Sequence, residues 1–137
     1  MKFDWRKFTE ADYHKYLEKR KAEVFDCHDY IGAVHIGDIS IDLIDRGAEG
    51  LLGYDFYVAH EDTGYGYKDD VLPYDHADGE DMAIPFGLSY SEFKARAEKL
   101  FEGFIVKCDK CRSWSSELKR DVEYSLVEHA SRPLLIW

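Results

Sequence analysis

The feature that most constrains the fold is the spacing of apolar residues in the first half of the chain. From Val34 to Val58 they recur at every second position, interrupted at Gly37 and by a turn at residues 46–50. Side chains of a β-strand alternate between the two faces of a sheet, so this spacing is typical of strands with one buried face. Gly37 marks either a bulge or a tight turn. We therefore predict an antiparallel sheet from Tyr30 to Glu61.

Three other segments have helical spacing and helix-end signals. Thr9 can cap a helix predicted over Glu10–Phe25, whose stripe recurs at three, four or seven residues. Ser89-Tyr-Ser-Glu92 is a capping box that opens a second helix, which we expect to end near Gly103. Apolar residues at intervals of four predict a third helix over Ser115–Ala130, stopped by a following proline.

The C-terminal residues Leu134–Trp137 are wholly apolar, and we expect them to dock on the sheet as a short strand. No repeat or linker interrupts the pattern. The fold class predicted is α+β, a single domain over residues 1–137 with an antiparallel sheet packed against about three α-helices.

Charge is unevenly distributed along the chain. The formal net charge is −10, and residues 61–81 hold eight acids and one base, a formal charge of −7. Such a segment repels phosphate and attracts cationic surfaces, so we expect a basic protein partner and neither direct nucleic-acid nor membrane binding. The alternative interpretation is that acidity serves solubility alone. No apolar run reaches the roughly 20 residues that cross a bilayer, and the three cysteines are an odd number, so we expect a cytoplasmic protein.

Within this segment, Asp62-Thr-Gly-Tyr-Gly-Tyr67 places Tyr65 and Tyr67 around glycines that permit a tight loop. Tyrosine is favoured at interfaces, although both rings could instead pack on the sheet edge. The predicted partner-binding residues are Asp62, Tyr65, Tyr67, Asp69, Asp70, Asp75, Asp78, Glu80 and Asp81.

The same acids do not form a standard calcium loop. Counting from Asp75, the third and fifth positions are Ala77 and Gly79, which lack the oxygen side chains of an EF-hand. His60 and His76 lie near acids, but no serine or cysteine has the context of an activated nucleophile. We predict no catalytic residues and expect the protein not to be an enzyme.

The cysteines leave a zinc site open. Cys108 and Cys111 are two residues apart, a gap that lets both thiolates reach one ion, and Cys27 with His129 (or His28) could complete a tetrahedral set. Only half of the usual double-knuckle pattern is present. Reduced thiols without metal, and therefore no cofactor, are the alternative.

Several motifs together resemble small uncharacterised acidic proteins of Gram-positive bacteria, their phages and mobile elements. The motifs are Asp62-Thr-Gly-Tyr-Gly-Tyr67, Pro73-Tyr-Asp75, Ser89-Tyr-Ser-Glu-Phe93 and Ala130-Ser-Arg-Pro-Leu-Leu-Ile-Trp137. The resemblance spans the last two-thirds of the chain, and Cys108 and Cys111 are not typical of that group. It implies a setting in which small acidic proteins act as anti-CRISPR or anti-restriction proteins by occupying the nucleic-acid groove of a defence nuclease.

The sequence therefore favours an acidic inhibitor that blocks a basic nucleic-acid-binding partner by mimicking nucleic acid. Two alternatives stay open: a toxin-neutralising immunity protein and a small metal-dependent enzyme.

Overall fold

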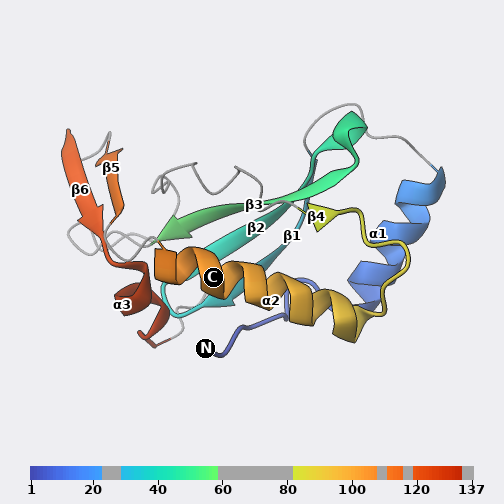
Figure 1. Cartoon of the computed structure of the whole chain (residues 1–137), viewed down its shortest axis with the longest axis horizontal. Coiled ribbons are helices and arrows are strands. Elements are labelled where there is room, and N and C mark those ends of the chain that lie inside the picture. Colours follow the sequence, from blue (N-terminus) through green and yellow to red (C-terminus); the bar gives the residue numbers. More distant parts are fainter. Residues whose placement is uncertain (23–28, 59–81, 108–110, 116–118, 134–137) are drawn as a thin grey trace.

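The computed structural model describes residues 1–22, 29–58, 82–107, 111–115 and 119–133. It contains helices and antiparallel strands, and the predicted α+β class is confirmed (Figure 1). In chain order they are α1 (Glu10–Ala22), β1 (Asp29–Ile36), β2 (Ile39–Asp45), the 3-10 turn η1 (Gly47–Glu49), β3 (Leu51–Val58), β4 (Met82–Ala83), α2 (Tyr90–Lys107), β5 (Cys111–Ser115), β6 (Arg120–Tyr124) and α3 (Leu126–Ala130).

The predicted sheet is present as four antiparallel strands in the order β1-β2-β3-β4. Gly37 is in a tight turn and not in a bulge: its φ of 53° is left-handed, and Ile36 pairs directly with Ile39. A second left-handed glycine, Gly50, ends η1 and leads into β3. Strand β4, which pairs only through two residues, was not predicted from the sequence.

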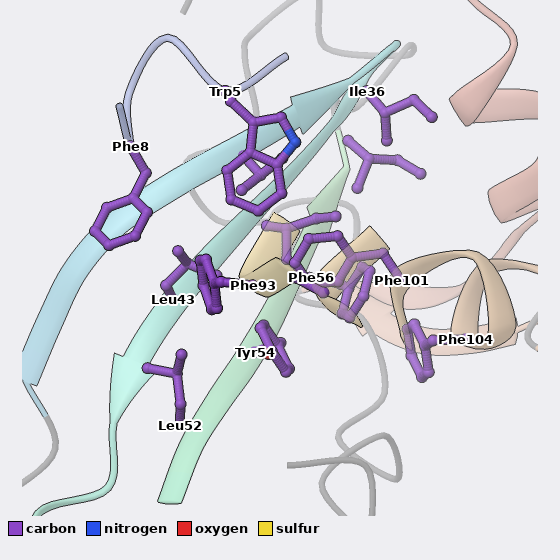
Figure 2. Packing of buried hydrophobic residues seen from close by; sticks show 14 of the residues in the cluster. Trp5, Phe8, Ile36, Leu43, Leu52, Tyr54, Phe56, Phe93, Phe101 and Phe104 are labelled. Atoms are coloured by element: carbon purple, nitrogen blue, oxygen red, sulfur yellow. The ribbon is translucent and has the colours of Figure 1, made fainter. Parts of the chain in front are cut away.

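The core lies between one face of the sheet and α2, which crosses that face (Figure 1). Phe101 meets Tyr54 edge to face at 4.8 Å between ring centroids, and Phe104 lies 4.2 Å from Phe56 (Figure 2). Leu43 of β2 and Phe93 of α2 are fully buried in the same cluster. Aromatic pairs of this kind add to the apolar burial and hold helix and sheet in one arrangement.

Helix α1 begins as predicted, because Thr9 and Asp12 cap each other. The Thr9 hydroxyl accepts from the Asp12 amide at 3.3 Å, and the Asp12 carboxylate accepts from the Thr9 amide at 2.9 Å. Tyr13, Tyr16 and Leu17 form its buried stripe. The part of the prediction beyond Ala22, including Val24 and Phe25, lies outside the described residues.

The predicted end of the second helix at Gly103 is wrong. The Ser89 hydroxyl caps the helix as expected, accepting from the Glu92 amide at 3.2 Å, but α2 then continues to Lys107. Phe104 and Ile105 in its last turn are buried, and Phe104 packs on Phe56 of the sheet. Their burial outweighs the roughly 1 kcal/mol that a glycine costs inside a helix.

The predicted third helix over Ser115–Ala130 is also wrong. Strands β5 and β6 pair antiparallel, with Cys111 opposite Tyr124 and Ser115 opposite Arg120, and of the described residues in the predicted range only those of α3 are helical. Lys119 before β6 has a left-handed φ of 53°, which a helix does not tolerate. The true helix start is Ser125, whose hydroxyl accepts from the Glu128 amide at 3.3 Å. The predicted strand over residues 134–137 lies outside the described residues.

Candidate functional site

The described fold is electrically neutral. The residues that the structure describes carry 16 acidic and 16 basic side chains, so the formal net charge of −10 belongs to the remaining residues. Residues 59–81 alone contribute eight acids against one lysine. This one stretch therefore accounts for −7 of the formal net charge of −10.

Two described strands mark where that stretch leaves and rejoins the sheet. Residues 59–81 follow Val58 at the end of β3 and precede Met82, which pairs with Leu52 near the start of the same strand. Six residues of strand separate the two attachment points, or about 20 Å at 3.3 Å per residue. The predicted partner-binding residues, from Asp62 to Asp81, lie outside the described residues, and their role stays a prediction.

The face of the sheet opposite α2, here called the second face, carries a carboxylate pair that sequence reasoning missed as a site. Asp42 of β2 is directly opposite Asp55 of β3 in the strand register, and both side chains are partly buried. Burial, and then the charge of Asp55, raise the pKa of Asp42 to about 6, while Lys7 opposes the shift. The alternation placed both residues on polar positions, but only the register brings them together.

A histidine and a serine lie beside this pair on the second face. His35 Nε2 is 3.1 Å from the Ser40 hydroxyl, and the two side chains are 4% and 1% exposed. Burial, with Lys7, lowers the pKa of His35 to about 4, although Asp4 opposes the shift. A histidine and serine in contact can form a base and nucleophile. Here the imidazole is a weak base and both groups are buried, so we interpret the contact as structural.

His129, predicted as a zinc ligand, joins α3 to the β1–β2 turn. Its Nδ1 lies 3.3 Å from Asp38 Oδ2, and Arg132 Nη1 donates to the same oxygen at 3.0 Å. Arg132 Nη1 is also 3.2 Å from His129 Nδ1, so a single tautomer cannot satisfy both contacts of that nitrogen. A Cβ on Gly37 would lie 2.1 Å from the His129 carbonyl oxygen, which explains why glycine occupies the turn.

The zinc set stays a prediction. Cys27 and Cys108 lie outside the described residues, and of Cys111 only the strand backbone is described. The described part of the chain contains no group of three histidine, cysteine or acidic side chains that could hold a metal. Any zinc on His129 would have to bind Nε2, because Nδ1 faces Asp38 and a guanidinium that repels a cation.

A groove of about 910 Å3 runs beside the N-terminal segment, between the first turn of α2 and the end of α3. Lys94 Nζ lies over the rings of Tyr90 and Trp5, 5.1 and 5.8 Å from their centroids. The arginines of the groove are paired: Arg6 with Asp4 at 2.6 Å and Arg132 with Asp38 at 3.0 Å. The two guanidinium charges are therefore compensated by carboxylates.

The chain matches no known protein family, no curated protein and no solved structure. Its resemblance to small acidic phage and mobile-element proteins therefore remains a sequence-based interpretation. Among the helices of the described residues, none is long and apolar enough to cross a bilayer.

Proposed function

We propose that this protein is an acidic inhibitor that binds a basic nucleic-acid-binding partner and blocks its nucleic-acid channel. An anti-CRISPR or anti-restriction protein acting on a defence nuclease in the cytoplasm is the specific form of this proposal. The carboxylates of residues 59–81 would occupy the positions in the partner's channel that bind nucleic-acid phosphates. Tyr65 and Tyr67 would be the main packing contacts of the interface. Binding of this kind needs no catalytic residue.

The location of the negative charge is the observation that supports this function. A chain that is acidic for solubility needs net charge, but it does not need to place that charge in one segment. Here the described fold has equal numbers of acidic and basic residues, while residues 59–81 carry a formal charge of −7. A neutral scaffold with one dense acidic segment fits a surface that replaces a polyanion, because the binding surface of such a partner is basic.

The attachment points of the acidic segment agree with this role. The strand pairs at Leu52–Met82 and along β2–β3 hold both ends of the segment on one sheet. The end-to-end separation of about 20 Å corresponds to about six base-pair steps of B-form DNA at 3.4 Å each, so the segment is on the scale of a short nucleic-acid stretch.

The test compares two variants of equal total charge. The first replaces Asp69, Asp70, Asp78, Glu80 and Asp81 by Asn or Gln. The second replaces five exposed acids of the described fold by Gln or Asn: Glu18, Glu49, Glu92, Glu102 and Asp121. Tagged wild type and both variants are used to capture partners from host lysate, which mass spectrometry identifies. The purified partner is then titrated against a fluorescent oligonucleotide with each protein as competitor.

We expect the wild type and the second variant to displace the oligonucleotide and the first variant to lose most of its affinity. Affinity should also fall steeply between 50 and 500 mM salt, because added salt shortens the Debye length, which is about 10 Å at 0.1 M, and so weakens attraction between exposed charges. A partner that retains both variants equally and is insensitive to salt would contradict nucleic-acid mimicry. A captured toxin that binds no nucleic acid would instead support an immunity protein.

A further inference from the structure

The register of β2 and β3 places two carboxylates against each other. Asp42 and Asp55 are a directly opposed cross-strand pair in an unbroken run of pairs from Ile39–Val58 to Asp45–Leu52. Directly opposed side chains have Cβ atoms about 4.5 to 5.5 Å apart, and like charges in such positions repel. Both side chains are also partly removed from water, which weakens screening of that repulsion.

We propose that Asp42 and Asp55 share one proton in the folded protein, so that the second face of the sheet is a pH-sensitive switch. In mild acid the pair carries one negative charge, and at neutral pH it carries two. The switch lies on β3, the strand that leads into residues 59–81. It is independent of the proposed inhibitory function.

The neighbouring groups determine which carboxyl holds the proton. Arg46 lies over Gly53 on the same face, two residues from Asp55, since a Cβ at Gly53 would be 2.3 Å from Arg46 Nε. We assign the shared proton to Asp42, because burial favours the neutral form of its carboxyl. Burial and Asp55 raise the pKa of Asp42 to about 6, as expected for that assignment.

Of the other groups near the pair, Lys7 opposes the shift, whereas His35 and Ser40 add no charge near pH 6. Lys7, from the N-terminal segment, favours ionised Asp42. His35 of β1 lies on the same face and is neutral near pH 6, because burial and Lys7 lower its pKa to about 4. On the described part of this face, Ser40 is uncharged and bonds to His35.

Carboxyl 13C NMR titration of the full chain tests the proposal. The aspartate side-chain resonances are followed from pH 3 to 8 in wild type, in Asp55→Asn and in the control Asp121→Asn, which alters an exposed residue of β6. We expect the Asp42 resonance to titrate near pH 6 in wild type and in the control. In Asp55→Asn its midpoint should fall by on the order of one pH unit, because the repelling charge is gone.

The reciprocal variant, Asp42→Asn, keeps the test decisive if Asp55→Asn does not fold. In that variant Asp55 should titrate in a single step, whereas in wild type the pair should show two coupled steps. Two results would overturn the proposal: an Asp42 midpoint that is unchanged in Asp55→Asn, which would mean that burial alone shifts it, or independent single-step titrations of both residues in wild type.

Discussion

The Tyr16 hydroxyl donates a hydrogen bond of 2.5 Å to Oδ2 of Asp45, a carboxylate that is fully buried at the end of β2. Arg20 Nε lies 3.2 Å from the same oxygen and forms an ion pair with it. Oδ1 accepts from the Gly47 amide at 2.7 Å. Asp45 therefore joins α1 to β2 and to the turn that follows.

Removal of this carboxylate is expected to destabilise the fold strongly. Asp45→Ala leaves the Arg20 guanidinium without its buried counterion, a change that typically costs about 3 to 5 kcal/mol. Tyr16→Phe removes one hydrogen bond and keeps the ring, so it should cost about 1 to 2 kcal/mol. Urea unfolding of both variants measures the difference. Equal losses in the two variants would show that the ion pair adds little to the hydroxyl bond.

Tyr13 provides a comparable link between α1 and the segment before α2. Its hydroxyl lies 2.7 Å from the Leu88 carbonyl oxygen and 3.0 Å from the Pro85 carbonyl oxygen, in a buried position. Tyr13→Phe should lower the free energy of unfolding by about 1 to 2 kcal/mol, since it leaves these carbonyls without their donor. Thermal and urea unfolding check the value. A loss below about 0.3 kcal/mol would mean that water replaces the hydroxyl.

Two glycines should respond to alanine in opposite directions. Gly103 is exposed inside α2 with no atom near a built Cβ, so Gly103→Ala should stabilise the protein by about 0.5 to 1 kcal/mol. Gly37 has a positive φ and no room for a Cβ beside the His129 carbonyl, so Gly37→Ala should cost more than about 2 kcal/mol. Urea unfolding of the two variants measures both changes. A shift of both unfolding midpoints in the same direction would contradict this prediction.

The pH dependence of stability should contain two opposing contributions from the second face. The pKa of Asp42 is raised from 3.8 to about 6. The stability that Asp42 contributes to the folded state is therefore fully present below pH 3.8 and is lost as pH rises through 6. The pKa of His35 is lowered from 6.5 to about 4, so its contribution is full above pH 6.5 and is lost as pH falls through 4. Between pH 4 and 6 the two nearly cancel.

Single variants should expose each contribution. In Asp42→Asn the free energy of unfolding should fall as pH is lowered from 6.5 to 4, by on the order of 1 to 3 kcal/mol. In His35→Gln it should rise by a similar amount as pH is lowered from 6 to 4. Urea unfolding across this range gives both slopes. If stability changed with pH in the same direction in both variants, Asp42 and His35 would not make opposing contributions.

Local signals in the sequence determined where most elements begin. Thr9 and Ser89 act as helix caps in the structure, as predicted. The alternation from Val34 to Val58 predicted the strands, because successive side chains of a strand point to opposite faces and only one face is buried. That pattern is visible within each strand's own sequence. Ser125 and Glu128 form the same cap motif and indicate the start of α3. The apolar residues at intervals of four before Ser125 instead led to the prediction of a longer helix.

Only tertiary structure decided what depends on contacts between distant residues. Helix α2 passes Gly103 because Phe104 packs on Phe56, a contact between segments far apart in the chain. Asp42 faces Asp55 because of the β2–β3 register, and a shift of one residue would separate them onto opposite faces. The concentration of negative charge in residues 59–81, by contrast, is readable from the sequence alone. Spacing encodes local backbone preference, but register and packing are set by the whole chain.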